Sequence, residues 1–312
     1  MKRITGLDNV TGSDRGASVA IGNFDGVHLG HQAVLRAARE AAPSAPLAVL
    51  TFEPHPREAF RPGDPPFRLM SPETRAHRLE KLGVDLLYEL PFHGIRHMEH
   101  AAFSAEVLQA GLGAAHVTVG ADFRYGNGRS GDTSTLRASG ASLGFGVSVA
   151  ELMSPSPEAP RVSSTAIRTA LTEGRPDAAA LMLGHWHRIE GPIVHGEKRG
   201  RELGYPTANM GLDGLHLPRF GVYAVLVDVL DGAHAGTYRG AASLGVRPQF
   251  GANVPNLETY LFDFAGDLYG ALVSVALVEF LRPEARFDTL DALIAQMQDD
   301  CTTARARLVD LS

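Results

Sequence analysis

The chain has 312 residues, of which 44% are hydrophobic and 21% are charged, with a formal net charge of −6 and a pI near 6.1. This length is typical of two domains, and the composition provides enough apolar residues for two cores. The acidic balance argues against broad nucleic-acid binding, which requires a clustered basic face. The single cysteine, Cys301, excludes an internal disulfide and a cysteine-based zinc site, and it is typical of a reducing compartment.

The N-terminal segment, residues 1–14, is polar and contains no apolar run of the length of a signal peptide or a membrane-spanning helix. We therefore expect a cytoplasmic protein that is not inserted in a membrane. The acidic balance still allows small anionic ligands, because local arginine, lysine and backbone N–H groups can bind them.

The first half of the chain alternates short apolar runs with stretches rich in alanine, glutamate and arginine. The runs are bounded by glycine or proline, as in strands that are buried on both faces of a parallel sheet. Between them, residues 32–42 and 71–82 have a helix-like composition. The pattern predicts a doubly wound α/β domain over residues 1–185. Its expected strands are residues 17–21, 47–52, 84–90 and 117–119.

The second part, residues 186–312, contains strand-like runs separated by turn residues, with Asp231-Gly232 and Ala265-Gly266-Asp267 as hairpin signals. These runs predict a small antiparallel β-barrel. Apolar residues then recur at helical intervals from Leu290 to Cys301, which predicts one amphipathic helix over residues 289–308 that packs on the barrel. The expected barrel strands are residues 187–194, 221–229, 235–243, 257–264 and 272–281.

The motif GNFDGVHLGH, residues 22–31, directly follows the first expected strand. Its glycines allow the backbone to approach a phosphate closely, and a helix that starts near His28 presents free N–H groups and a positive dipole end. His28 and His31 are three residues apart, which places both imidazoles on one helix face. The alternative is an ordinary tight turn with packed histidines; the coincidence of strand, helix start and two histidines favours phosphate binding. The candidate phosphate-binding residues are Gly22, Asn23, Phe24, Asp25 and Gly26.

This motif resembles the HxGH signature of the nucleotidyltransferase superfamily, in the form found in prokaryotic bifunctional riboflavin kinase/FAD synthetases. TFEPHP at residues 51–56, GADFRYGNGRSGD at 120–132 and RVSSTAIR at 161–168 follow in the order and approximate spacing of that family. The last motif resembles the family's second phosphate motif. The resemblance implies that Arg168 stabilises the pyrophosphate leaving group. It also implies that the triphosphate is bound by the hydroxyls of Ser163, Ser164 and Thr165.

The resemblance further implies a flavin-nucleotide side of this first site. Phe52 and His55 would lie near the flavin phosphate, and Asp122 with Phe123 would lie in a loop between the ATP end and the flavin end. Phe52 has an open alternative, because an aromatic residue that ends a buried run is often part of the core.

The segment HGEKRGRELGYPTANM, residues 195–210, is rich in glycine and basic residues and has no regular periodicity. Glycine N–H groups and a lysine suit a phosphate, and the side-chain oxygens of Thr207 and Asn209 suit Mg²⁺. The segment alone leaves open whether it is simply an exposed, charge-rich hairpin. The residues expected to bind phosphate are Gly196, Lys198 and Gly200.

The same segment resembles the riboflavin kinase pattern that ends in P-T-A-N, and ETYLFDFAGDLYG at residues 258–270 resembles the catalytic strand of that fold. The resemblance makes Glu258 the candidate base for the terminal ribityl hydroxyl of riboflavin. RPEARF at 282–287 and the C-terminal helix resemble the region that covers the flavin, although their charges are also typical of solvated faces. The flavin-binding residues implied there are Arg282, Arg286, Asp300 and Arg305.

The resemblance covers nearly the whole chain and implies two ATP-dependent reactions. The C-terminal domain would phosphorylate riboflavin to FMN, and the N-terminal domain would transfer AMP from ATP to FMN, giving FAD and pyrophosphate. The expected partners are ATP with Mg²⁺, riboflavin and FMN, without nucleic acid or membrane, in a monomer or a weakly self-associating chain. One alternative is an enzyme in which only one site is active, or in which the N-terminal domain adenylylates another acceptor. The other is a flavin-binding sensor, which would require the loss of catalytic residues that this chain retains.

Overall fold

The computed structural model describes residues 1–151, 162–195, 204–246 and 254–311. The chain forms two compact units, which are described separately. The first comprises residues 1–65 and 75–163, and the second comprises residues 66–74 and 164–312. The domain boundary expected between residues 185 and 186 remains a prediction, because these units are defined by spatial proximity and not by activity.

The first unit is built on a six-stranded sheet in which every neighbouring pair is parallel, with the order β1-β4-β3-β2-β5-β6. The four strands expected from the apolar runs are all present, and the doubly wound α/β architecture is confirmed. The strands are β1 (Lys2–Thr5), β2 (Ser18–Ile21), β3 (Leu47–Glu53), β4 (Leu86–Pro91), β5 (His116–Gly120) and β6 (Gly146–Ala150).

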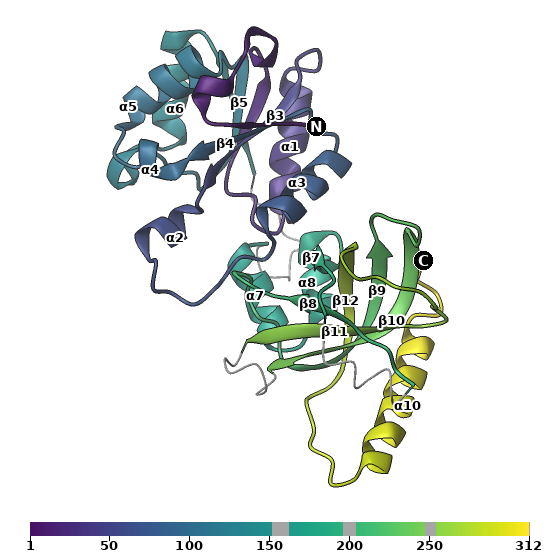
Figure 1. The fold of residues 1–312 in the computed structure, drawn as a ribbon. Helices are drawn as coiled ribbons and strands as arrows, with labels where there is room; N and C mark the ends of the chain where they lie inside the picture. The colour runs from purple at the N-terminus through teal and green to yellow at the C-terminus, as the bar shows by residue number, and fades with distance from the viewer. Residues whose placement is uncertain (152–161, 196–203, 247–253, 312) are drawn as a thin grey trace. The chain divides into compact units, whose positions relative to one another are not determined.

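Helices cover both faces of this sheet, with α1 and α3 on one side and α5 and α6 on the other (Figure 1). Both faces of the central strands are therefore buried, which explains their continuous apolar runs. On the side of α6, Ile21, Leu50 and Val119 pack against Phe103 and Leu136 in one buried cluster. The helices are α1 (Leu29–Ala41), α2 (Pro56–Phe60), α3 (Pro72–Lys81), α4 (Phe92–Ile95), α5 (His100–Ala102), the π-helix η3 (Phe103–Gly111), α6 (Thr133–Leu143), and the short 3₁₀ helices η1 (Leu7–Asn9), η2 (Gly12–Asp14) and η4 (Asn127–Arg129).

The strand order reverses between β2 and β5. From β2 the chain builds β3 and β4 on one side and then returns to add β5 on the other. A crevice outside the carboxyl ends of the strands at such a switch point is the usual ligand site of an open α/β sheet. The loops that start at Gly22 and Ala121 leave these two strand ends, so the topology brings the first and third motifs to the same edge.

The second unit contains a six-stranded antiparallel sheet with the order β7-β12-β9-β10-β11-β8. The backbone N–H of Val194 donates to the carbonyl of Asn209 at 2.9 Å, which links the two edges and nearly closes the predicted barrel. The strands are β7 (His187–Pro192), β8 (Ala208–Gly211), β9 (Gly221–Val229), β10 (Gly236–Val246), β11 (Pro255–Leu261) and β12 (Leu272–Arg282), and the helices are α7 (Ser164–Thr172), α8 (Pro176–Leu183) and α10 (Leu290–Arg307).

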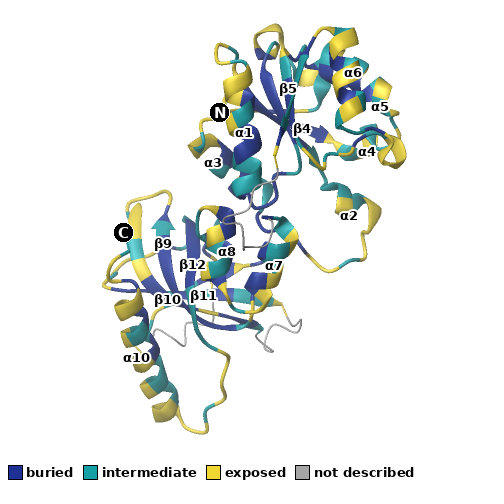
Figure 2. Cartoon of the chain, turned by 180° about the vertical axis from the view of Figure 1, so that it is seen from behind, coloured by how far each residue is buried: buried dark blue, intermediate teal, exposed yellow. Residues whose placement is uncertain are grey.

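Among the described residues, the buried apolar contacts of the C-terminal helix α10 with the outer face of the barrel come from its last turns. Ala304 and Leu308 are fully buried in a cluster with Ala224 and Leu226 of β9. At the other end of the helix, Leu290 is 55% exposed. In Figure 2, β9 is mostly dark blue, whereas most of α10 is teal or yellow. The expected helix is confirmed, while its apolar stripe is covered along only part of its length. Within the described residues, no helix combines the length and hydropathy needed to cross a membrane.

Candidate active sites

The loop after β2 is a tight turn with unusual backbone angles. Phe24 and Val27 have φ of 52° and 41°, and Gly26 has φ of 86°. The backbone N–H of Val27 donates to the carbonyl of Phe24 at 3.1 Å and closes the turn. Positive φ is costly for a β-branched residue and persists only where the surroundings impose it. The complete burial of Phe24 and Val27 provides those surroundings.

His28 and His31 lie in contact, with ring centroids 3.7 Å apart and planes inclined by 15°. The helix begins at Leu29, close to the expected start near His28, so His28 is the N-cap of α1 and not part of its first turn. Its Nδ1 accepts a hydrogen bond from the backbone N–H of His31 at 3.3 Å, so the neutral ring carries its proton on Nε2. A Cβ at Gly30 would lie 3.1 Å from the His28 ring, so a larger residue there would press on that ring.

His31 is held in its neutral form. Burial, and secondarily the charge of His28, hold the pKa of His31 well below its usual value of 6.5. Its Nδ1 is buried and has no hydrogen-bond partner within the described residues. A buried polar atom without a partner is costly, so a phosphate oxygen at this nitrogen would fit the site.

The other predicted phosphate-binding residues of the motif form the framework of the turn. The carbonyl of Asn23 accepts a hydrogen bond from Thr51 of β3 at 3.3 Å. The ring of Phe24 is fully buried and packs 4.9 Å from the His31 ring. Asp25 is also buried. A contact of Phe24 with ATP would therefore come from its main chain.

Aromatic side chains form a row on the side of the first unit where a flavin is expected. The ring of Phe52 lies 6.1 Å from Phe92 and 6.4 Å from Phe103, so it belongs partly to the core. Phe92 in turn lies 5.4 Å from Phe60, which is 64% exposed. Sequence analysis missed Phe60, although a bulky aromatic residue that ends the short helix after His55 is a possible signal. The row provides an exposed apolar surface beside the second motif.

The remaining flavin candidates of this unit lie on two loops. His55 is the N-cap of α2, and its Nδ1 accepts from the backbone N–H of Arg57 at 3.1 Å. Asp122 is exposed in the loop after β5. The ring of Phe123 stacks on Tyr125 at 5.4 Å and 16°. The structure thus places Phe123 beside the aromatic core and leaves the Asp122 carboxylate in solvent.

A buried arginine, Arg75, braces the carboxyl ends of β3 and β4. It is 3% exposed, and its guanidinium donates to Glu53 and to Glu89 at 2.7 Å each. Glu89 also accepts from Arg3 at 2.9 Å. Sequence analysis did not identify this network, because the charged residues are distant in the chain. Since Glu53 belongs to the TFEPHP motif, the network fixes the part of that motif that lies in β3.

The second phosphate motif opens the helix α7. Ser164 and Thr165 occupy its first turn, directly after Ser163. The Nη1 atom of Arg168 donates to the carbonyl of Phe67 at 3.3 Å, and the guanidinium carbon lies 5.6 Å from the centre of the Phe67 ring. The side chain of Arg168 is thus held by Phe67, which lies in the same second unit.

The barrel brings Glu258 and Asn209 together, because they are directly opposed on β11 and β8. The amide of Asn256 donates to Asn209 Oδ1 at 3.3 Å and to Glu258 Oε1 at 3.1 Å. The amide of Asn209 donates to the carbonyl of Thr207 at 3.2 Å. Sequence analysis missed Asn256, although residues two apart on a strand share a face. Gly196, Lys198 and Gly200 lie outside the described residues.

The two predicted metal ligands of the barrel site suit Mg²⁺. Thr207 offers a hydroxyl and Asn209 an amide carbonyl, and this ion prefers oxygen ligands. No group of three or more histidine, cysteine or acidic side chains that could hold a metal occurs among the residues described. Two neutral oxygen ligands would suit an ion that keeps several waters.

The C-terminal flavin candidates lie in two different environments. Arg282 forms a bidentate ion pair with Asp300 at 2.8 and 2.7 Å, and Gln296 also donates to Asp300 at 3.0 Å. Arg286 is exposed in the loop that follows β12. The pair between Arg282 and Asp300 connects the end of β12 to α10, so these two predicted residues are brought together.

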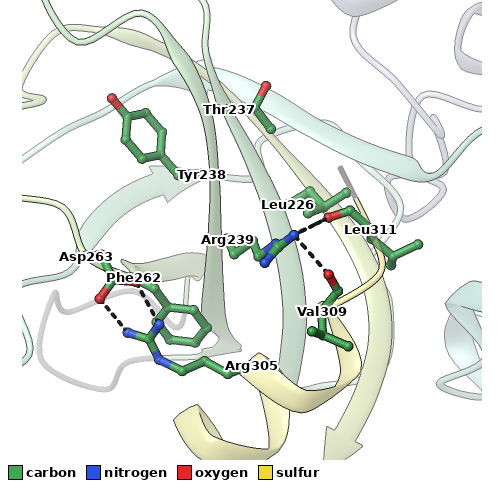
Figure 3. A pocket seen from close by; sticks show the side chains of 9 residues that line it. All are labelled: Leu226, Thr237, Tyr238, Arg239, Phe262, Asp263, Arg305, Val309 and Leu311. Carbon is green, nitrogen blue, oxygen red and sulfur yellow. Dashed lines mark hydrogen bonds and ion pairs between the residues drawn. The ribbon is translucent and has the colours of Figure 1, made fainter.

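Arg305 lies apart from that pair, in a cavity of about 650 Å³ on the outer face of the sheet. Figure 3 shows its guanidinium directed at Asp263, with contacts of 2.7 and 2.9 Å, and lying over the ring of Phe262 at 4.2 Å. This pairing holds the pKa of Asp263 below its usual value. Arg305 therefore forms its own ion pair with Asp263, apart from the ion pair between Arg282 and Asp300.

Comparisons with known proteins match both halves of the chain. The FAD synthetase family model matches residues 10–166, and the riboflavin kinase model matches residues 183–308. The bifunctional riboflavin kinase/FMN adenylyltransferase of Pseudomonas fluorescens is 41% identical over 98% of this chain and 97% of its own. The protein of that name from Haemophilus influenzae is 39% identical over 98% and 99%. A solved structure titled macrolide-efflux protein, from Streptococcus pneumoniae, has a TM-score of 0.84 and 30% identity over 97% of this chain and 98% of that chain.

The matches follow the order that the motifs predict and extend over almost the whole chain. They confirm the resemblance stated from the HxGH, TFEPHP and P-T-A-N motifs. The chain belongs to the bifunctional riboflavin kinase/FMN adenylyltransferase family, with its FAD synthetase part N-terminal and its riboflavin kinase part C-terminal.

Proposed function

We propose that the two reactions of this family are carried out by two separate sets of residues. Adenylyl transfer to FMN depends on the stacked pair His28 and His31, and phosphorylation of riboflavin depends on Glu258 opposite Asn209. This division rests on the arrangement of the barrel. Glu258, the only carboxylate that we predict to be catalytic, lies opposite Asn209, a predicted Mg²⁺ ligand on the neighbouring strand. Such a constellation suits phosphoryl transfer to a hydroxyl.

In the adenylyl transfer, an oxygen of the FMN phosphate attacks the α-phosphorus of ATP. A new phosphoanhydride bond forms, and the bond from the α-phosphorus to the bridging oxygen breaks, so that pyrophosphate leaves. No protein nucleophile is required. Since His31 stays neutral, the two imidazoles contribute hydrogen bonds and positioning at the phosphates, supported by the N-terminus of α1. Gly22, Asn23 and Gly26 shape the turn around these phosphates.

We assign Ser163, Ser164, Thr165 and Arg168 to the triphosphate and its leaving group. This assignment is carried by the motif RVSSTAIR and its place in the family pattern. An arginine is suited to the role, because its planar guanidinium can form two parallel hydrogen bonds to phosphate oxygens.

In the kinase reaction, Glu258 accepts the proton of the terminal ribityl hydroxyl of riboflavin while that oxygen attacks the γ-phosphorus of ATP. ADP leaves with the electron pair of the broken bond. Thr207 and Asn209 would hold Mg²⁺, which neutralises charge on the phosphates. Asn256 would fix the carboxylate, since its amide contacts both Glu258 and Asn209. Gly196, Lys198 and Gly200 are assigned to the phosphates by the motif alone.

The flavins are assigned to two apolar surfaces that carry nearby polar groups. FMN would lie on the aromatic row of Phe52, Phe92 and Phe60, close to His55 and to the loop of Asp122 and Phe123. Riboflavin would be covered by the segment that the ion pair of Arg282 and Asp300 fixes, with Arg286 and Arg305 as further candidates. Location in the cytoplasm, a monomeric or weakly associating state and the absence of nucleic acid belong to the same proposal.

The variant Glu258→Gln tests the division of labour. It keeps the shape of the side chain and removes its ability to accept a proton, so FMN production from riboflavin should fall by roughly 10²–10⁴-fold. FAD production from supplied FMN should stay at the level of the unaltered protein. Chromatographic separation of riboflavin, FMN and FAD measures both rates in the same samples. Equal loss of the two activities would contradict the assignment of Glu258 to one reaction.

A further inference from the structure

His216 contacts both helix α7, which carries Arg168, and residues 67–68, which bind the Arg168 side chain. It lies between β8 and β9, in the part of the chain that the riboflavin kinase family model covers. Arg168 belongs to the phosphate motif assigned above to adenylyl transfer. Both residues lie in the second unit, although the motif of Arg168 is assigned to the reaction of the FAD synthetase part.

The side chain of His216 holds the backbone of α7. Its Nε2 lies 3.1 Å from the carbonyl oxygen of Arg168 and 3.1 Å from the hydroxyl of Thr172. A carbonyl can only accept, so Nε2 carries the proton and donates to Arg168. The hydroxyl of Thr172 donates to the same carbonyl at 2.9 Å. Arg168 is therefore tied at its main chain to a residue 48 positions later.

The main chain of His216 holds the segment that orients the Arg168 side chain. Its backbone N–H donates to the carbonyl of Arg68 at 2.8 Å, and the neighbouring Leu215 forms a bridge with Arg68. The residue before Arg68 is Phe67, whose carbonyl accepts from Arg168 Nη1 at 3.3 Å. These contacts form a closed ring, in which His216 fixes both the backbone of Arg168 and the acceptor of its guanidinium.

The chemistry of His216 suits this structural task. It is half-buried, and burial is the main cause that lowers its pKa from 6.5. A neutral imidazole donates from Nε2 without adding a second positive charge beside Arg168. Leu171 contributes a further anchor, because its carbonyl accepts from the backbone N–H of Arg219 at 2.9 Å. Helix α7 is thus fixed to the segment of residues 215–219 at two points.

We propose that His216 is a positioning residue for adenylyl transfer, which acts by holding Arg168 in the orientation that binds the leaving pyrophosphate. The inference rests on the proposed role of Arg168. A residue of the riboflavin kinase part would then serve the reaction of the FAD synthetase part, without touching its substrates.

The variants His216→Ala and His216→Gln test this in the full chain. The alanine variant should lower kcat for FAD formation from FMN about tenfold, since small misplacements of a catalytic group are costly. KM for FMN and the riboflavin kinase rate should stay within about twofold. Glutamine offers an amide N–H near the position of Nε2, so it should restore most of kcat. His234→Ala, which removes a half-buried histidine elsewhere in the same unit, is the matched control and should retain both activities.

A purely structural role gives a different result: both activities and the melting temperature would fall together, and glutamine would be no better than alanine. That result overturns the proposal. The double variant Arg168→Ala/His216→Ala should be no slower than Arg168→Ala, because His216 acts through Arg168. Full activity of His216→Ala beside an impaired Arg168→Ala overturns the inference and leaves the role of Arg168 intact. Full activity of Arg168→Ala removes that role, and the inference with it.

Discussion

At the scale of single residues, burial is the main cause that lowers the pKa of His31 and of His187. His187, at the start of β7, is 4% exposed, and burial with the nearby His216 and His185 lowers its pKa to about 3. In the unfolded chain the same side chain has a pKa near 6.5. Below pH 6.5 the unfolded state therefore binds a proton that the folded state does not.

This difference predicts a loss of stability in acid. Since the folded pKa is depressed, the contribution of His187 is fully present above pH 6.5 and is lost as the pH falls toward 3. The free energy of unfolding should decrease by up to about 1.4 kcal/mol per pH unit. His187→Leu should remove that slope. Urea unfolding at pH 7 and 5.5, followed by the fluorescence of Trp186, the single tryptophan, measures the difference. If the free energy of unfolding falls equally between pH 7 and pH 5.5 in the unaltered protein and in His187→Leu, His187 is not the cause of the pH dependence.

The motifs predict which residues lie close together better than they predict the protonation state of those residues. The spacing of His28 and His31 correctly indicates neighbouring imidazoles, and the structure places Glu258 opposite Asn209 of P-T-A-N. The catalytic roles of these residues stay predictions. The neutral state of His31 depends on burial, which no local pattern contains. Asn256 could not be assigned because its role arises from strands β8 and β11 lying side by side.

At the scale of elements, the buried network of Arg75 connects the ends of β3 and β4. Its carboxylate partners Glu53 and Glu89 lie on different strands. Removing one partner of a buried ion pair leaves an uncompensated charge, which costs about 3–5 kcal/mol. Arg75→Met should therefore destabilise the first unit by about 3 kcal/mol in chemical denaturation. Arg36→Met, at an exposed position of α1, is the control and should change stability by less than about 0.5 kcal/mol.

Equal effects of Arg75→Met and Arg36→Met would show that the network has no structural importance. Loss of FAD formation without loss of stability in Arg75→Met would instead assign Arg75 to the chemistry.

The strands that the sequence analysis predicted most closely are buried on both faces. Continuous apolar residues mark β2 to β5, and β9 is predicted with its exact bounds. The missed strands are short and lie at sheet edges, where polar residues are allowed: β1, β6 and β8. A four-residue edge strand such as Lys2–Thr5 has no periodicity that differs from a loop. The incomplete covering of α10 was also beyond prediction, because apolar spacing indicates a face without indicating what covers it.

At the scale of the whole molecule, the family carries out two consecutive reactions in one chain, and the product of the second part is the substrate of the first. The central claim is that these reactions are chemically independent at the residues that perform them. A variant of the first site should therefore turn the chain into a source of FMN alone.

The most direct test follows riboflavin, FMN and FAD over time after purified protein is mixed with riboflavin and Mg²⁺-ATP. The unaltered protein should form FMN and then FAD. The double variant His28→Ala/His31→Ala should form FMN at an unchanged rate, while FAD formation falls by at least about 10²-fold, because hydrogen bonds to the reacting phosphates are lost. FAD formation at the unaltered rate in that variant, or the loss of FMN formation, would contradict the account.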